Sequence, residues 1–228
     1  MPADVLDLVQ HALDPEWEPG FDLYRDHLAA LNRIMMDSGV PMEGSLFTPN
    51  RRPVLPEMPA PAFRPKRRNF ALFSASGDAM LEIGFNGGHS CMLALTMNPG
   101  LRYTGVDLGF HAYTRPCYDY LRGVFGDRMT LHFGDSRDVL PRLREQGERY
   151  DLFHLDGGHG IDVAHADLTN IIAFGCGGAG LLVDDTPVAE IDAVCEMEVM
   201  RGRIAPVMLE RLWSETPLHR MFRVTGKQ

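Results

Sequence analysis

The sequence predicts an α/β fold built on a mostly parallel, seven-stranded sheet, and three observations lead to that prediction. From Asn69 onward, short β-rich runs alternate with helical stretches, which is typical of parallel strands joined by crossover helices. The last two strand-like runs are separated by only a short connection, which favours an antiparallel hairpin at one edge. Residues before Asn69 lack this alternation, so we expect an N-terminal extension, 1–68, and an α/β domain, 69–228.

The extension reads as a helical segment followed by a proline-rich one. Apolar residues spaced three or four apart predict a buried helical face within residues 1–40, made by Tyr24, Leu28, Leu31 and Met35. Seven of the sixteen prolines fall between Pro41 and Lys66, which excludes a continuous helix or a central strand there. We expect a linker, a lid, or an arm to a second subunit. The basic cluster at its end is interpreted as solvated surface: Arg64, Lys66, Arg67 and Arg68.

Within the α/β domain the predicted elements follow one another with short connections. Strands are expected at 79–83, 102–106, 129–133, 150–155, 180–183, 204–212 and 219–225. Helices are expected at 89–97, 114–125, 136–143, 163–174 and 189–201. This order is that of a doubly wound, Rossmann-like sheet, in which ligands bind at the carboxyl ends of the strands.

Composition restricts the class of partner. The chain has 228 residues, of which 45% are hydrophobic and 23% charged, as in an ordinary folded protein. A formal net charge of -9 disfavours nucleic acid or an anionic membrane, because both require a continuous positive field. The acidic amino terminus and the lack of a long apolar run predict a cytoplasmic protein without a membrane span. Four widely separated cysteines are expected to be reduced.

A glycine-rich turn follows the first strand. The segment Glu82-Ile-Gly-Phe-Asn-Gly-Gly-His-Ser90 allows a tight turn and close approach of a ligand to the backbone, and the next helix offers free N–H groups at its start. The spacing differs from G-x-G-x-x-G, so a nicotinamide dinucleotide is the weaker expectation. The alternative is a junction that uses glycine only for turning.

The next two strands also end in polar residues. Asp107 closes the second strand, where a fixed carboxylate can accept hydrogen bonds from both hydroxyls of a ribose. Asp135 and Ser136 end the third strand, where they can contact an adenine edge. Each position has a simpler interpretation as a turn or helix-cap residue. Three such features at the same end of consecutive strands favour a nucleotide site.

The fourth and fifth strands end in carboxylates. Asp156 follows one strand, and Asp184 and Asp185 follow the other. Neighbouring strands lie about 4.8 Å apart, so these side chains are expected to converge, with no basic residue nearby in sequence to neutralise them. A hard divalent cation such as Mg²⁺ would do so, because it prefers carboxylate oxygens. The alternative is that one or two of them cap helices.

Taken together, the motifs resemble a known enzyme family. The order and spacing of Glu82-Ile-Gly-x-x-x-Gly, Asp107, Gly134-Asp135, Leu155-Asp156-Gly-Gly-His159 and Asp184-Asp185 resemble class I S-adenosylmethionine-dependent methyltransferases of the divalent-metal type. The pattern is similar to the macrocin O-methyltransferase group and, more distantly, to catechol O-methyltransferases. The resemblance covers the expected α/β domain and not the extension.

The resemblance implies a set of site residues. S-adenosylmethionine would be held by Glu82, Gly84, Asn86, Gly88, Ser90, Asp107, Asp135, Ser136 and Asp156. Mg²⁺ would be held by Asp156, Asp184 and Asp185, although catechol-type relatives commonly carry Asn at the third position. His159 stands where those relatives have a lysine and would act as the catalytic base. His154, by contrast, is interpreted as a packed, hydrogen-bonded core residue.

The implied reaction is methyl transfer to a hydroxyl of a small-molecule acceptor. Two adjacent oxygens on the acceptor are favoured, because they can chelate the open positions of a metal ion. N-methylation, hydroxylation on the same fold and a non-catalytic relic stay open as alternatives. A homodimer or a larger homo-oligomer is also left open.

Overall fold

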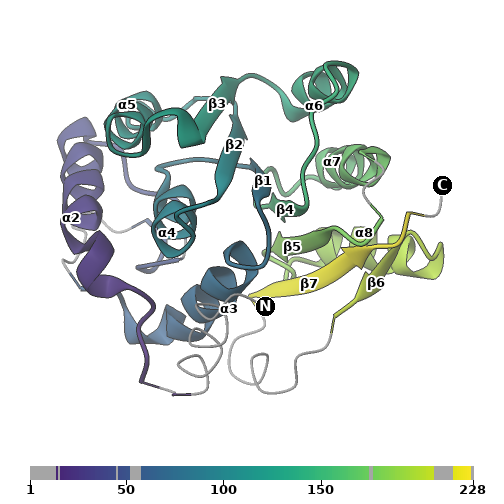
Figure 1. The fold of residues 1–228 in the computed structure, drawn as a ribbon, viewed down its shortest axis with the longest axis horizontal. Helices are drawn as coiled ribbons and strands as arrows, with labels where there is room; N and C mark the ends of the chain where they lie inside the picture. The colour runs from purple at the N-terminus through teal and green to yellow at the C-terminus, as the bar shows by residue number, and fades with distance from the viewer. Residues whose placement is uncertain are drawn as a thin grey trace.

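The computed structural model describes residues 14, 16–44, 46–51, 58–174, 177–207 and 218–226. Among these residues, seven strands form one sheet in the order β3-β2-β1-β4-β5-β7-β6 (Figure 1). The parallel strands are β1 (Ala79–Ile83), β2 (Arg102–Asp107), β3 (Met129–Phe133), β4 (Leu152–Leu155) and β5 (Gly180–Asp184). At the edge, β7 (His219–Val224) runs antiparallel to β5 and to β6 (Ile204–Pro206). The predicted doubly wound sheet with an antiparallel edge is confirmed; residues 208–212 of the expected sixth strand lie outside the described residues.

Helices cover both faces of the sheet (Figure 1). One face carries α2 (Phe21–Ser38), α3 (Arg64–Ser74), α4 (His89–Met97) and α5 (Thr114–Phe125), and the other carries α6 (Ser136–Glu145), α7 (Ile161–Ala173) and α8 (Ala189–Met200). Successive strand residues point to opposite faces, so the core has two halves. Met80 packs in the half under α2–α5, and Leu81 packs in the half under α6–α8. Short 3₁₀ helices at Pro61–Phe63 and Gly126–Arg128 complete the structure.

The apolar face of α2 is the one that its sequence predicts. Its buried residues include all four members of the stripe, Tyr24, Leu28, Leu31 and Met35. The helix packs against α4 and α5 and ends at Gly39, whose left-handed conformation is the usual helix terminator. The extension is therefore part of the core on this face of the sheet.

The helix α3 is a finding that the proline-rich pattern does not predict. It begins at Arg64, with Pro65 in its first turn, where proline loses no helical hydrogen bond. It spans the expected boundary between residues 68 and 69. The interpretation of its basic cluster as solvated surface is wrong, because Lys66, Arg67 and Arg68 are buried. Lys66 is buried because this helix packs over the carboxyl ends of β4 and β5 and the amino end of β7. Arg67 and Arg68 instead contact residues of the extension.

The chain order reverses between β1 and β4, so the carboxyl ends of these two strands border a crevice. Gly84 follows β1 and Asp156 follows β4. Gly84 has a φ of 97°, and a Cβ atom there would lie 1.9 Å from the carbonyl oxygen of Asp156. Glycine at this position therefore permits both the turn and the close approach of the two loops.

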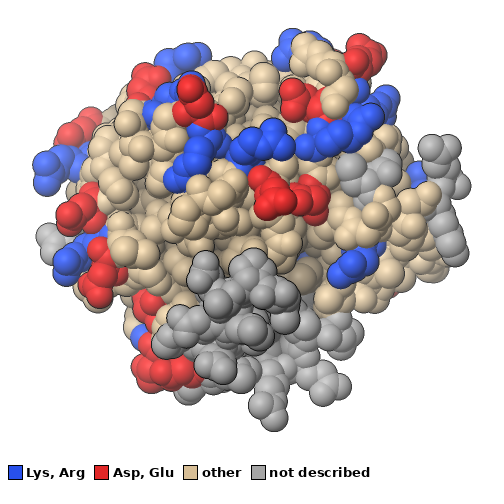
Figure 2. Space-filling view, viewed as in Figure 1, with Lys and Arg blue, Asp and Glu red and all other residues tan. Residues whose placement is uncertain are grey.

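The surface shows no single dominant charge on the face drawn in Figure 2, where Lys and Arg side chains lie beside Asp and Glu side chains. No helix in the described ranges has both the length and the apolar character that a bilayer crossing demands. Cys91, Cys117 and Cys195 are buried free thiols, whereas Cys176 lies outside the described residues.

Replacing Gly84 by Ala is expected to lower the free energy of unfolding by about 2–5 kcal/mol, because backbone strain and a backbone clash add. The matched control is Gly147→Ala: Gly147 also has a positive φ, 83°, but a Cβ atom added there would meet nothing within 4 Å. That change should cost only about 1 kcal/mol. Urea unfolding of both variants measures the difference, and equal losses would contradict the close approach.

Candidate active site

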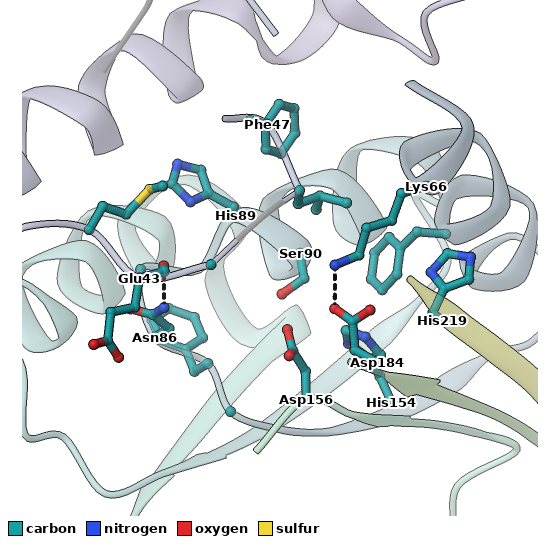
Figure 3. Close-up of a pocket in the computed structure, with 17 residues that line it drawn as sticks. Glu43, Phe47, Lys66, Asn86, His89, Ser90, His154, Asp156, Asp184 and His219 are labelled. Atoms are coloured by element: carbon teal, nitrogen blue, oxygen red, sulfur yellow. Dashed lines mark hydrogen bonds and ion pairs between the residues drawn. The ribbon is translucent and has the colours of Figure 1, made fainter. Parts of the chain in front are cut away.

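Polar side chains form a row at one edge of the sheet, at the carboxyl ends of β1, β4 and β5 and at the amino end of the antiparallel strand β7. Figure 3 shows His154, Asp156, Asp184 and His219 of this row. Strand register explains the row: Glu82 of β1 is the partner of His154 in β4, and Asp184 of β5 is the partner of His219 in β7. Asp156 lies two residues after His154 and so projects to the same side. Ligand atoms of His154, Asp156 and Asp184 lie within 4.8 Å of one another. The convergence expected of Asp156 and Asp184 is therefore present.

A lysine from the extension enters this row. Lys66 Nζ lies 2.5 Å from Asp184 Oδ2, and the two side chains are 4% and 3% exposed (Figure 3). Burial lowers the pKa of Lys66, but the carboxylates of Asp184 and Asp156 outweigh it and raise the pKa above its ordinary value. Burial raises the pKa of Asp184, but Lys66 outweighs it and the pKa is lowered. No basic residue lies near these carboxylates in sequence, and the positive charge that neutralises Asp184 comes instead from Lys66 of α3.

Two further residues of α3 cover the row. Asn69 Nδ2 donates a hydrogen bond to His219 Nε2 at 3.0 Å, and the ring of Phe70 packs on the imidazole of His154, with ring centroids 5.0 Å apart. Burial lowers the pKa of His219 to about 4, so its ring is neutral and its Nε2 can accept the bond. The tautomer of this histidine is therefore set by Asn69.

Glu82 is fully buried and holds His154. Its Oε1 lies 2.6 Å from His154 Nδ1, and the hydroxyl of Tyr103 donates to its other oxygen. Burial lowers the pKa of His154, but the hydrogen bond and charge of Glu82 outweigh this and raise it. His154 is buried and hydrogen-bonded, as expected for a core histidine. Glu82, proposed from the resemblance as a cofactor residue, instead faces this network.

A cavity of about 330 Å³ opens over the ends of β1 to β4. Six residues expected to bind the cofactor line it: Gly84, Asn86, Asp107, Asp135, Ser136 and Asp156. Ser90 lines a neighbouring cavity, and Glu82 and Gly88 line neither. Gly88 instead caps α4, where a Cβ atom would lie 2.5 Å from the ring of Phe85.

The acidic residues of this cavity also perform the local roles considered as alternatives. Asp107 accepts hydrogen bonds from the backbone N–H groups of Asn86, at 2.7 Å, and Gly109, at 2.6 Å. Asp135 caps α6 by accepting from the backbone N–H of Arg137 at 2.9 Å, and the Arg137 side chain lowers the pKa of Asp135 to about 2. Each carboxylate oxygen can accept more than one hydrogen bond, so a ligand can share them.

A second, narrower cavity adjoins the first and opens to solvent. The polar row and Lys66 form one side of it (Figure 3). Its apolar lining comes largely from the extension: Met42, Leu46, Phe47 and Phe70. The two cavities share Glu43, Gly84, Asn86 and Asp156. The hydrogen bond from Asn86 Nδ2 to the carbonyl oxygen of Glu43, 2.5 Å, ties the extension to the glycine turn at this junction.

Asp185 and His159 lie beside this site, in a small pocket that Asp156 and Asp184 also line. Asp185 follows the end of β5 with a φ of 53°, and its Oδ2 lies 2.7 Å from His159 Nε2. The His159 side chain is 56% exposed and lines neither of the two cavities described above. The three expected metal ligands line one small pocket, but only Asp156 and Asp184 belong to the group whose ligand atoms lie within 4.8 Å of one another. Asp185 lies beyond the end of β5 in a left-handed conformation, and its carboxylate contacts His159.

The residues present do not fit a hard divalent cation well. An orphaned oxygen favours an ion, since Asp184 Oδ1 is buried with no hydrogen-bond partner. The other oxygen holds the ammonium of Lys66, however. A divalent ion and an ammonium on one carboxylate, about 5 Å apart, would repel by roughly 7 kcal/mol at an effective dielectric constant of about 20.

S-adenosylmethionine fits its predicted cavity better. Gly84 lines the cavity beside the turn, and Asp107 supplies a fixed carboxylate at the end of β2. Phe110 and Leu108 are exposed apolar side chains on the rim of the same cavity, 82% and 51% exposed. An apolar rim beside an acidic residue suits a nucleoside, which presents a flat base and a ribose diol.

Comparisons with known proteins agree with this fold. Residues 81–186 match a family model described as a methyltransferase domain. The O-methyltransferase TomG from Streptomyces achromogenes, solved with SAM, is 18% identical, with 87% of this chain and 89% of that chain covered and a TM-score of 0.61. An O-methyltransferase from Bacillus cereus, solved with SAH, is 16% identical, with 88% and 90% covered and a TM-score of 0.63. No curated protein matches the sequence.

A third similar structure was solved with a metal ion. The MycE methyltransferase from the mycinamycin biosynthetic pathway, in complex with Mg, SAH and mycinamycin VI, is 16% identical. The match covers 72% of this chain and 49% of that chain, with a TM-score of 0.50. These structures confirm the predicted Rossmann-like fold, and the match to a methyltransferase-domain model covers residues 81–186.

Acid is expected to destabilise the protein through His219. A histidine whose folded pKa is lowered contributes stability above its unfolded pKa, about 6.5, and loses it as the pH falls toward the folded value of about 4. The loss should be on the order of 3 kcal/mol. Urea unfolding at pH 7 and pH 4.5 should show a smaller acid loss in His219→Gln than in the unmodified protein. An equal loss of stability in acid for both proteins would mean that a group other than His219 causes the acid sensitivity.

Proposed function

We propose that this chain, which carries a methyltransferase domain, transfers a methyl group from S-adenosylmethionine to a hydroxyl oxygen of a small molecule. The observation that carries the proposal is the meeting of two cavities at Gly84, Asn86 and Asp156. One has the carboxylate of Asp107 and suits a nucleoside; the other is partly apolar and suits an organic acceptor. Two ligands bound this way meet at one point, which is what group transfer requires.

The chain's own residues would position the reactants. S-adenosylmethionine, when bound, supplies an electrophilic methyl group on a sulfonium. Asp107 would accept hydrogen bonds from the ribose, Asp135 and Ser136 would lie toward the base, and Asp156 would lie near the sulfonium at the junction. Burial and the neighbouring carboxylate of Asp184 raise the pKa of Asp156, which favours its neutral form. On the acceptor side, Phe47 and Phe70 would exclude water.

The geometry does not support two parts of the mechanism that the resemblance implies, namely His159 as the base and a bound metal ion. His159 as base would need to reach the acceptor cavity, but it pairs with Asp185 outside it. A metal ion would need the carboxylate that Lys66 occupies. The proposal therefore rests on positioning and on the charges that line the two cavities.

Product analysis tests the reaction. The purified protein is incubated with S-adenosylmethionine carrying a labelled methyl group and a panel of phenols, catechols, sugars and amines. Label in an ether product, with one equivalent of S-adenosylhomocysteine, supports O-methylation; label on nitrogen supports N-methylation, and a gain of oxygen supports a hydroxylase. Failure to bind the cofactor by calorimetry would contradict the proposal and favour a relic.

Replacing Asp107 by Ala is expected to weaken S-adenosylmethionine binding by roughly 10- to 100-fold, the loss of one or two hydrogen bonds to a charged acceptor. Titration calorimetry measures the dissociation constant. Asp119→Ala removes the same charge from an exposed position of α5 and should leave affinity unchanged. An equal effect of both changes would mean that net charge, and not the ribose contact, governs binding.

A further inference from the structure

Lys66 occupies the position in which this fold is expected to hold a cation. Its ammonium contacts one oxygen of Asp184, is attracted by Asp156, and lines the acceptor cavity. The side chain comes from α3, on the opposite side of the cavity from the strands that supply the carboxylates (Figure 3). It is therefore a positive charge at the wall of the acceptor cavity, next to Asp156 at the junction with the cofactor cavity.

The position of this ammonium is fixed by its neighbours on α3. Arg67 is fully buried; its guanidinium contacts both carboxylate oxygens of Glu18 and donates to the carbonyl oxygens of Leu46 and Ala60. Pro65 restricts the first turn of the helix. Lys66 lies between Pro65 and Arg67 in the chain, so its ammonium has little freedom to move away from Asp184. A preorganised charge of this kind stabilises developing charge more than a mobile one does.

Resting on the proposed function, we infer that the Lys66 ammonium, held by Asp184, replaces a divalent metal ion as the cation that binds the acceptor oxygen, and that the reaction needs no metal. Lys66 is then a catalytic residue contributed by the extension. A single ammonium binds one oxygen and does not chelate two, so a lone hydroxyl suffices. The apolar side formed by Met42, Phe47 and Phe70 favours an aromatic ring beside that oxygen.

The acceptor class that fits is a phenol or an enol bound as its anion. Its hydroxyl proton leaves to solvent on binding, and the oxyanion pairs with the ammonium. An oxygen lone pair then forms the O–CH₃ bond while the C–S bond breaks, and the electron pair of that bond stays on sulfur. The products are a methyl ether and a neutral thioether, so atoms and charges balance.

Metal binding is the first test, and it does not require turnover. Mn²⁺ is titrated into the full-length protein and followed by its electron paramagnetic resonance signal. The wild type should leave Mn²⁺ free, whereas Lys66→Met should bind one equivalent through Asp156 and Asp184. Stoichiometric Mn²⁺ binding by the wild type would overturn the inference. Lys66→Arg, which keeps the charge, is the matched control and should not bind.

Anion binding is the second test. 4-Nitrophenol is titrated into the protein in the presence of S-adenosylhomocysteine, and the visible absorbance of its anion is followed. The wild type should bind the probe as the anion and lower its apparent pKa, and Lys66→Met should weaken binding by roughly 10- to 100-fold. The double variant Lys66→Met/Asp184→Asn, which leaves no unpaired buried charge, controls for misfolding and should also fail to bind. Retained binding by folded Lys66→Met would contradict the role.

Turnover separates this inference from the proposed function. If methylation occurs, the wild type should retain full activity in a chelator, and mono-hydroxyl phenols should be accepted as well as catechols. Lys66→Met should lower kcat by roughly 10- to 100-fold while the dissociation constant of S-adenosylmethionine changes little. Loss of activity in chelator with recovery in Mg²⁺ would sink the inference and leave the methyltransferase intact. Cofactor binding without any methylated product would instead count against the proposed function. The metal-binding and anion-binding tests would then still decide whether Lys66 takes the place of a metal ion.

Discussion

The buried ion pair between Lys66 and Asp184 is the constraint on which the arrangement of the site depends. The strand ends carry three acidic side chains in a small volume, Glu82, Asp156 and Asp184, of which Glu82 and Asp184 are buried. Buried carboxylates persist only when they are paired, because desolvation of each costs several kcal/mol. His154 pairs with Glu82 and Lys66 pairs with Asp184. The helix α3 must therefore lie over β5 for the site to exist.

This constraint explains why the N-terminal extension behaves as part of the catalytic unit. The row of charges needs a cover that carries a cation, and α3 supplies it at Lys66 together with the amide of Asn69 for His219. Arg67, on the adjoining face, binds the segment that brings Phe47 over the acceptor cavity. One short helix thus neutralises the site and positions its apolar side. A change in the extension is consequently a change in the acceptor cavity, whereas the cofactor cavity is built mainly from the α/β domain.

The sequence predicts the features that depend on local pattern. Local patterns include the two-residue period of the strands, the 3.6-residue period of α2 and the glycine turn after β1. The order of the strands in the sheet follows from the succession of these elements along the chain. The role of Lys66 depends on a contact with Asp184, far along the chain, which no local pattern encodes. One signal was present: Lys66, Asn69 and Phe70 have helical spacing, but the prolines before them obscured the start of the helix. The left-handed conformation of Asp185, which directs its carboxylate to His159, is likewise not encoded by the strand pattern.

The two consecutive aspartates show how one strand end can serve two purposes. Asp184 is the last residue of β5 and points to the face that α3 covers, where it meets an ammonium in a nearly water-free setting. Asp185 turns through a left-handed conformation to an exposed histidine, where solvent screens the pair and the interaction contributes at most about 1 kcal/mol. An ion pair of the first kind resists exchange for a hydrated ion because release of the lysine would expose a buried carboxylate. The choice between lysine and metal at this corner is therefore set by burial, and α3 is the element that provides the burial.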